Sequence, residues 1–419
     1  LGAAVDLAGT LLRDGVPAGG ALAATFARTE RALAGLRYPL AAVADLADQL
    51  SAYRARAAHY RPERVADLIA ELHARDRAVR AGGATPAARV LGSDEPAETP
   101  LHRVRLTGLG CRVTGGTAEV YLADPAGMVL VLRGHWPGGQ TGAELAGRRM
   151  GGSTLAALAA GTVVSESATR SASRTVRLTT GRVGKTTVTP STGWDALSGA
   201  VLVRDLAALD RALAQAPPRL VRPRVAAEHL RAVAVAEVLG IGYHPGDQRL
   251  EALVADPAGG TARVSATYRP AAPGALDALD SALRADPRFL AGTVRRTGGT
   301  VVIDPTAVLV GSAVVVPDLA PGDGAADLSG ATPEPPDRVT AALDAAVAVC
   351  AEAAHRGLRH LPAGFAERVG DAAADLLAVG LPKAAATLTR FAEALTDPVT
   401  AGTAWVDAQI RISTTRDAR

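Results

Sequence analysis

The stretch GLGCRVTGGTAEVYLADPAG at residues 108–127 returns as GIGYHPGDQRLEALVADPAG at residues 240–259, 132 positions later. The two stretches align without a gap and place Glu119 and Glu251 in step. Each has the alternating apolar and polar positions of short strands, joined by turns that contain Gly, Asp and Pro. The glycines two residues apart at the start of each stretch predict a bulge or a close backbone approach. The sequence therefore predicts two copies of one mainly-β domain.

The similarity extends beyond this stretch. Gly161-Thr162-Val163 reappears as Gly292-Thr293-Val294, and AVLVRDL at residues 200–206 reappears as AVVVPDL at residues 313–319. In each copy we expect a helix after the first three strands and then a return to strands.

The segments before and after the two copies have apolar residues at helical spacing. One apolar stripe follows Pro62, a residue suited to a first helical turn, and consists of Val65, Leu68, Ile69 and Leu72. The expected fold class is α+β multidomain, with tandem duplicated mainly-β modules flanked by N- and C-terminal helical domains. The expected segments are a helical domain at 1–82, a first repeat module at 101–213, a hinge at 217–223, a second repeat module at 228–322 and a helical bundle at 336–415.

The composition limits the classes of function. The net charge is +3 and lysine occurs only at Lys185 and Lys383. Either arginine replaces lysine on ordinary surfaces, as in a chain from a GC-rich genome, or the basic balance marks an anionic partner. The two cysteines, Cys111 and Cys350, indicate no disulfide framework and favour the cytoplasm. No apolar run approaches the length of a membrane span, so we expect no membrane partner.

The two copies differ mainly by an insertion. After Val163 the first copy carries additional residues that are rich in Ser and Thr and contain one acid, Glu166. Guanidinium and hydroxyl groups on an extended hairpin can contact phosphate oxygens. The alternative is a solvated hairpin whose arginines pair with acids elsewhere. The candidate residues for binding nucleic acid or another anion are Arg170, Arg174, Arg177, Arg182 and Lys185.

Trp194, which lies beside Gly193 and the insertion, has two interpretations. It could be an exposed anchor for a protein partner, because tryptophan contributes strongly to protein interfaces. It could instead be buried against its own sheet. We take it as the candidate residue for partner binding.

No catalytic or metal-binding motif is found in the sequence. Glu352 and His355 share one helix face, but a di-iron centre requires a second pair of this kind, which is missing. Phosphate-binding loops, nucleophile elbows and HExxH motifs are also missing. The sequence therefore predicts no catalytic residue, no metal and no cofactor.

An enzyme with a site in the cleft between the two repeat modules stays an alternative. Its first candidate residues would be the carboxylates that both copies share, namely Asp124 with Asp256 and Glu119 with Glu251. Against this interpretation, an Asp before Pro typically starts a turn, and each Glu lies on the solvent face of a strand.

Three stretches resemble known proteins. LGSDEPAETPLHRVRL at 91–106, SASR at 171–174 and HRGL at 355–358 are similar to the body of actinobacterial proteins grouped with the SWIM zinc-finger family. The CxC and CxH zinc motif that defines this family is missing, so no zinc ligand carries over. The resemblance implies binding to nucleic acid or protein rather than catalysis, and it leaves open whether a zinc finger lies upstream of Leu1.

Together these observations predict a non-enzymatic accessory or scaffolding protein of a multiprotein assembly. We expect a protein partner, and we expect contact with nucleic acid or an acidic partner through the basic insertion of the first copy.

Overall fold

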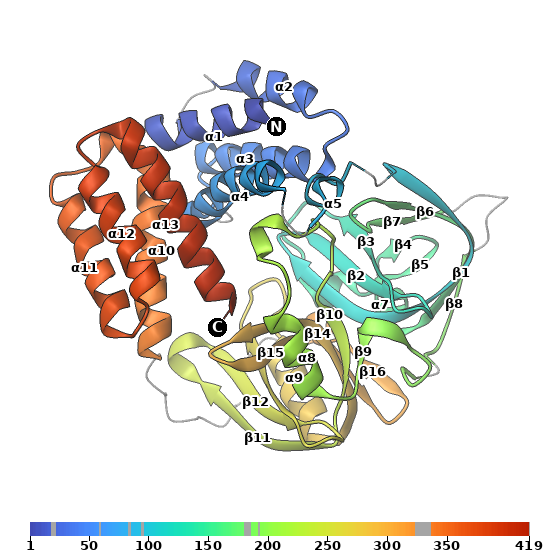
Figure 1. The fold of residues 1–419 in the computed structure, drawn as a ribbon. Coiled ribbons are helices and arrows are strands. Elements are labelled where there is room, and N and C mark those ends of the chain that lie inside the picture. Colours follow the sequence, from blue (N-terminus) through green and yellow to red (C-terminus); the bar gives the residue numbers. More distant parts are fainter. Residues whose placement is uncertain are drawn as a thin grey trace. The chain divides into compact units, whose positions relative to one another are not determined.

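The computed structural model describes residues 1–17, 22–57, 60–82, 85–93, 96–179, 186–191, 193–322 and 337–418. The chain forms two compact units (Figure 1). Unit 1 contains Leu1–Glu95, Pro217–Arg224 and Pro335–Arg419, and unit 2 contains Pro96–Ala216 and Val225–Glu334. Unit 1 is helical and unit 2 is mainly β, which confirms the predicted α+β multidomain class.

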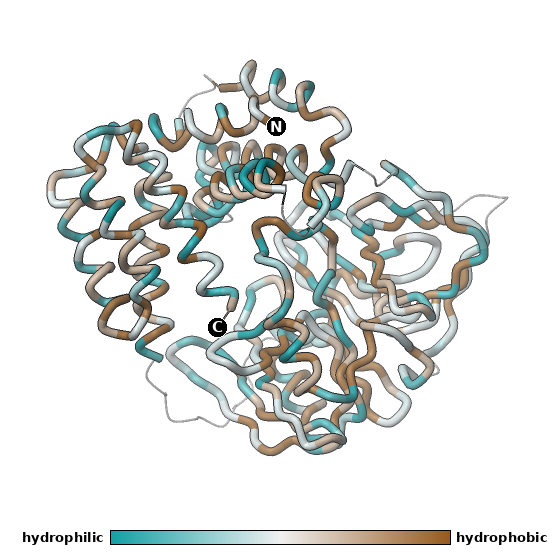
Figure 2. Tube along the Cα trace, viewed as in Figure 1, coloured by the Kyte–Doolittle hydropathy of each residue, from teal (hydrophilic) through white to brown (hydrophobic). Residues whose placement is uncertain are grey.

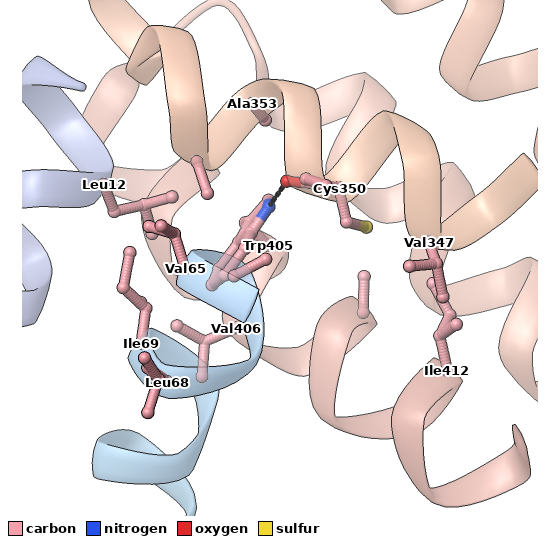
Figure 3. Close-up of a cluster of buried hydrophobic side chains, with 14 of the residues drawn as sticks. Leu12, Val65, Leu68, Ile69, Val347, Cys350, Ala353, Trp405, Val406 and Ile412 are labelled. Carbon is pink, nitrogen blue, oxygen red and sulfur yellow. Dashed lines mark hydrogen bonds between the residues drawn. The ribbon is translucent and has the colours of Figure 1, made fainter. Parts of the chain in front are cut away.

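Unit 1 combines helices from both ends of the chain. The first set is α1 (Gly2–Asp14), α2 (Ala23–Ala32), α3 (Arg37–Arg54), α4 (Pro62–Ala81) and α5 (Ala87–Leu91), and the second is α10 (Arg338–Arg356), α11 (Phe365–Ala378), α12 (Pro382–Ala394) and α13 (Pro398–Ala418). Buried side chains of both sets form one hydrophobic core. Within it, Trp405 donates a hydrogen bond from Nε1 to the carbonyl oxygen of Cys350 at 2.9 Å, with Leu12 and Val65 nearby (Figure 3).

This shared core changes the meaning of the predicted segments. The division of the sequence at 82 and 336 stays a prediction about segments, whereas in space the helices on either side belong to one unit. The physical reason is composition. Burial of apolar surface stabilises a fold by roughly 25 cal/mol per Å². Alanine side chains bury little such surface, so many alanine-rich helices must pack together to form a stable core.

Helix α4 follows the predicted apolar stripe. Pro62 begins the helix, where its missing N–H costs nothing, and Val65, Leu68 and Ile69 are fully buried. Gly82 ends the helix with a left-handed φ of 60°. Helices in Figure 2 mix hydrophilic and hydrophobic positions, and none within the described stretches is long and apolar enough to cross a membrane.

The stretch 217–223, expected as a hinge between the repeat modules, lies in a segment of unit 1, Pro217–Arg224, that is bound to helix α4. The side chain of Arg75 is fully buried and donates from Nη2 to the carbonyl oxygen of Arg222 at 2.7 Å. Glu71 accepts from Nε of Arg75 at 2.9 Å and from Nε of Arg224 at 3.0 Å. A buried guanidinium must be paired in this way. The hinge interpretation is therefore wrong.

The buried charge predicts a large effect of mutation. Arg75→Leu should lower the free energy of unfolding by about 3–5 kcal/mol, because it leaves Glu71 buried with one partner fewer. Arg77→Leu is the matched control on the same helix, since Arg77 pairs with Asp407 at the surface and should cost less than about 1 kcal/mol. Urea denaturation of both variants measures the difference, and equal losses would contradict the assigned role of Arg75.

The first repeat module forms a six-stranded sheet. Its strands lie in the order β3-β2-β1-β6-β7, and β8 also pairs with β6. Helix α7 (Leu155–Ala160) precedes β6, and α6 (Gly142–Leu145), β4 (Arg149–Met150) and β5 (Ser153–Thr154) lie before it. The strands are β1 (Glu98–Thr114), β2 (Thr117–Ala123), β3 (Val129–His135), β6 (Thr162–Ser171), β7 (Val176–Leu178) and β8 (Thr186–Thr189).

The strands of the second repeat module belong to an eight-stranded sheet in the order β11-β12-β13-β15-β14-β10-β9, with β16 paired to β15. Strand β9, from the segment expected for the first module, joins this sheet through parallel pairing with β10. Helix α9 (Ala275–Arg284) joins β13 to β14, and α8 (Leu206–Ala214) follows β9. The strands are β9 (Leu202–Val203), β10 (Leu230–Ala234), β11 (Glu237–His244), β12 (Arg249–Ala255), β13 (Thr261–Thr267), β14 (Pro287–Thr297), β15 (Thr300–Val310) and β16 (Ala313–Val315).

The repeated sequence gives the same inward positions in both modules. Strands β2 and β12 correspond at the 132-residue offset, and in each of them alternate side chains are at most 4% exposed and lie in the core of their module. These side chains are Ala118, Val120 and Leu122 in β2 and Leu250, Ala252 and Val254 in β12. Because side chains alternate across a strand, this agreement means that both strands keep the same face inward.

The modules pack against each other where β1 approaches β15. The pairing of β1 with β2 shifts between Gly108 and Cys111, which marks a bulge. Within it, Gly110 has a φ of +96°, and a Cβ added there would lie 2.2 Å from the carbonyl oxygen of Thr306. The Thr306 hydroxyl donates to the carbonyl oxygen of Leu109 at 2.7 Å. The prediction of a bulge and a close backbone approach at these glycines is confirmed.

A glycine of the second copy provides a control for a test of this approach. Gly110→Ala should lower the free energy of unfolding by about 3 kcal/mol or more, because it combines a backbone clash with a left-handed φ. At Gly240, the counterpart of Gly108 in the second copy, an added Cβ meets nothing within 4 Å. Gly240→Ala should therefore change stability by less than about 1 kcal/mol. Urea denaturation distinguishes the two, and a tolerant Gly110 would contradict the packing.

Candidate nucleic-acid interface

The basic insertion lies on a hairpin with a counterpart in the second module. Strand β7 pairs antiparallel with β6, and a parallel bridge joins Thr175 to Val131 of β3. In the second module β15 likewise pairs antiparallel with β14 and parallel with β13. The β6–β7 hairpin of the first module therefore corresponds to the β14–β15 hairpin of the second, where Gly298 and Gly299 make a short turn.

The β6–β7 turn is stabilised by its own polar groups. Ser171 accepts from the backbone N–H of Thr175 through Oγ at 3.0 Å, and its own backbone N–H donates to the Thr175 carbonyl oxygen at 2.8 Å. Arg174 has a φ of 64°, and its carbonyl oxygen accepts from the N–H of Val131 at 3.0 Å. These bonds hold the hairpin backbone against β3.

Three predicted binding residues lie on this hairpin. Arg170 is at the end of β6, Arg174 in the turn and Arg177 on β7. Arg177 is exposed and pairs with Glu98 of β1, and Arg170 is also partnered. The predicted residues Arg182 and Lys185 lie outside the described residues.

Sequence reasoning missed Arg231, which joins this cluster from β10. Burial is the main cause that lowers the pKa of Arg231, and the positive charge of Arg174 lowers it further, whereas Glu228 raises it. Arg231 also donates from Nη1 to the carbonyl oxygen of Glu228 at 2.9 Å. No local pattern marks Arg231 as part of the site, because β10 comes more than fifty residues after the hairpin in the sequence.

The glutamates that both copies share make ion pairs on their own sheets. On β2, Glu119 pairs with Arg133 of β3 at 2.7 Å. On β12, Glu251 pairs with Arg249 at 3.0 Å and lies 3.4 Å from Nε2 of His244. Each shared Glu therefore pairs with an arginine of its own sheet.

The shared aspartates hold turns. Asp124 accepts through Oδ1 from the N–H of Met128 at 2.9 Å. Asp256 is 2% exposed and accepts through Oδ1 from Ala258 and Gly260 and through Oδ2 from Leu206 at the start of α8. Carboxylates that accept backbone N–H bonds in this way fix a loop. Asp124 and Asp256 therefore make contacts that stabilise turns.

Trp194 is fully buried, which contradicts its selection as an exposed partner anchor. Its Nε1 donates to the carbonyl oxygen of Gly108 at 3.2 Å, and its ring centroid lies 6.3 Å from that of Phe289. The alternative interpretation, burial against the sheet, is the one that the structure shows. A bulky indole covers more of the sheet when it packs inward and still satisfies its N–H.

Glu352 and His355 make contacts of their own. Glu352 pairs with Arg356 and Arg368, and Nδ1 of His355 lies 2.7 Å from the Tyr60 hydroxyl. Within the part of the chain that the structure describes, no group of three or more His, Cys, Asp or Glu side chains could hold a metal ion.

The two aspartate turns predict unequal effects on stability. Asp256→Ala should cost about 3 kcal/mol, because it leaves three backbone N–H groups without the carboxylate that they donate to. Asp124→Ala should cost about 1 kcal/mol, because one N–H loses a partner. Thermal or urea unfolding provides the measurement. A larger loss of unfolding free energy for Asp124→Ala would show that the burial of the carboxylate and the number of its hydrogen bonds do not determine how much it stabilises its turn.

The second module has the strand order of an OB-fold barrel. In this fold five strands close with the third parallel to the fifth and a helix between the third and fourth, and the second and third strands with the loops at their rim bind oligonucleotides or oligosaccharides. Strands β10 and β11 are the two halves of the first strand, followed by β12, β13, β14 and β15. The β6–β7 turn of the first module is then its loop between the fourth and fifth strands.

Comparison with known proteins agrees with this topology. Residues 227–336 match the YehQ C-terminal OB-fold domain, and residues 1–92 match the YehQ four-helical bundle domain. Protein YehQ of Escherichia coli (strain K12) is 29% identical over 221 residues, which is 49% of this chain. The chain spans 36% of the length of that relative. No solved structure matches the chain.

These matches correct the resemblance to SWIM zinc-finger proteins, which is wrong. The stretches at 91–106, 171–174 and 355–358 that suggested it are short and carry no zinc motif, whereas the matches to YehQ domains extend over residues 1–92 and 227–336. Protein YehQ is therefore what this chain is similar to, through a four-helical bundle domain and a C-terminal OB-fold domain.

Proposed function

We propose that this chain is a non-enzymatic accessory protein that binds single-stranded nucleic acid through the first repeat module. The contact surface is the β6–β7 hairpin with Arg170, Arg174 and Arg177. We propose Arg182 and Lys185 as further contacts from the sequence alone, because they lie outside the described residues. The OB fold supports this proposal, because its rim loops commonly bind oligonucleotides. The observation that carries it is the gathering of arginines on the loop that corresponds to a binding loop of that fold.

The charge distribution supports phosphate as the group recognised. Burial is the main cause that lowers the pKa of Arg231, and the charge of Arg174 lowers it further, so the Arg174 guanidinium acts electrostatically on Arg231. An anion between such groups would relieve their repulsion, and guanidinium groups bind phosphate oxygens in pairs. Few aromatic residues are present, so we expect contacts to the phosphate backbone rather than stacking on bases.

The remaining parts of the proposal concern the setting. The accessory role in a multiprotein assembly fits a helical unit that carries no motif for catalysis. Cytoplasmic location fits Cys111 and Cys350, which are both free thiols in the core.

Fluorescence anisotropy with a labelled single-stranded oligonucleotide tests the proposal. Arg170→Gln/Arg174→Gln should weaken binding at least about tenfold at low salt. The slope of log affinity against log salt should fall by about 1.4, because each lost phosphate contact accounts for about 0.7 on single strands.

The matched control is Arg390→Gln/Arg411→Gln, which removes two exposed arginines from helices α12 and α13. It has the same net charge as the test variant and should bind like the unmodified chain. Equal weakening by both variants would show that net charge alone governs binding. No binding by the unmodified chain at low salt would reject the proposal, and capture of an acidic polypeptide instead would favour an acidic protein partner.

A further inference from the structure

The free edge of β1 in the first module is covered. Beyond Thr107, β1 pairs with β2 on one side and no longer with β6 on the other. Groups from elsewhere in unit 2 bind that open side. Trp194 donates to the carbonyl oxygen of Gly108, Thr306 donates to that of Leu109 at 2.7 Å, and the N–H of Val113 donates to Asp318 at 2.8 Å. Covering an edge in this way prevents it from pairing with another strand.

The corresponding edge of β11 in the second module is open. Strand β11 pairs with β12 alone, and no hydrogen bond to its other side is found among the described residues. A Cβ at Gly240 would meet nothing within 4 Å, whereas one at Gly108 would lie 2.6 Å from a carbonyl oxygen. Leu239 and Leu253 are 48% and 42% exposed, whereas Tyr121, the counterpart of Leu253, is 7% exposed.

This edge lacks the protection that strand edges normally carry. Residues 238–246 contain no Lys, Arg, Asp or Glu, and Pro245 comes only after the strand has ended. Natural sheets usually protect an open edge with lysine, proline or a covering segment. The bulge lies at one end of the strand, and the five residues Gly240–His244 pair regularly with β12. A regular run without Lys, Arg, Asp or Glu, whose outer backbone groups have no partner among the described residues, is suited to pairing with another strand.

We propose that β11 pairs antiparallel with β11 of a second copy of this chain, so that the two second modules form one continuous sheet. Symmetric antiparallel pairing of the regular run places its middle residue, Gly242, on the two-fold axis. Ile241 then lies opposite Tyr243 of the second copy, which is a favourable pair of a β-branched and an aromatic side chain. Gly240 lies opposite His244, where the missing side chain leaves space.

Two observations favour a second copy as the occupant. The run is uncharged, so two identical strands meet without opposed like charges, and two-fold symmetric contacts are the commonest kind in homo-oligomers. The corresponding surface of the first module is already occupied by a strand from a module of the same fold, namely β15. The interface is small, so the dimer should be weak and depend on concentration.

Sedimentation equilibrium over a concentration series tests the association. Gly240→Lys should weaken the dimer at least about tenfold, because it places a cation opposite His244 and a lysine on the edge. Gly370→Lys is the control, since Gly370 is also exposed with nothing within 4 Å of an added Cβ and lies on α11 in unit 1. A monomer at every concentration, or equal weakening by both variants, would overturn the proposal.

Thiol cross-linking tests the register. The double variant Gly240→Cys/His244→Cys should give dimers with a short bis-maleimide, and each single variant should not. The native thiols leave little background because Cys111 and Cys350 are buried, and burial raises the pKa of Cys350 to about 12. Cross-linking of the single variants as readily as the double variant would overturn the register. If Gly240→Lys instead weakened oligonucleotide binding by a monomeric chain, the strand would bind nucleic acid and not a second copy.

Discussion

The close approach of β1 to β15 is the contact on which the arrangement of unit 2 depends. It requires a residue without a side chain at Gly110, because the Thr306 carbonyl oxygen occupies the place of a Cβ. Arg112 then reaches Asp304 at 2.7 Å, and the N–H of Val113 reaches the buried carboxylate of Asp318. The contact therefore has two effects. It joins the two copies, and it covers the edge of β1 that β6 leaves unpaired beyond Thr107. It also explains why the same sequence motif is buried in one module and exposed in the other.

Unit 1 depends on a hydrophobic core that helices from both ends of the chain share. Its alanine-rich helices have small side chains, so it takes helices from both chain ends to build one core around Trp405. Arg75 adds a buried charge that binds the segment between the repeat modules to α4. Charged groups of this kind cost free energy to bury and become stabilising only when every partner is in place. The buried charge therefore fixes where the segment Pro217–Arg224 lies on α4.

Much of the fold was accessible from sequence. The repeat at the 132-residue offset predicted two mainly-β copies, the glycine pair predicted a bulge, and the stripe after Pro62 predicted α4. The candidate site was accessible only in part. Arg170, Arg174 and Arg177 were found because they are close in sequence, whereas Arg231 arrives from another strand. Trp194 was selected wrongly, because a single tryptophan beside a glycine has no pattern that distinguishes burial from exposure.

The sequence by itself determined the two copies and their inward faces, because strand alternation and turn residues act between near neighbours. Tertiary structure decided which copy has a covered edge, which helices share a core and which segment binds Arg75. These outcomes depend on backbone groups that meet across more than a hundred residues, as Leu109 and Thr306 do. Contacts of that range leave no local periodicity in the sequence, so only the folded chain reveals them.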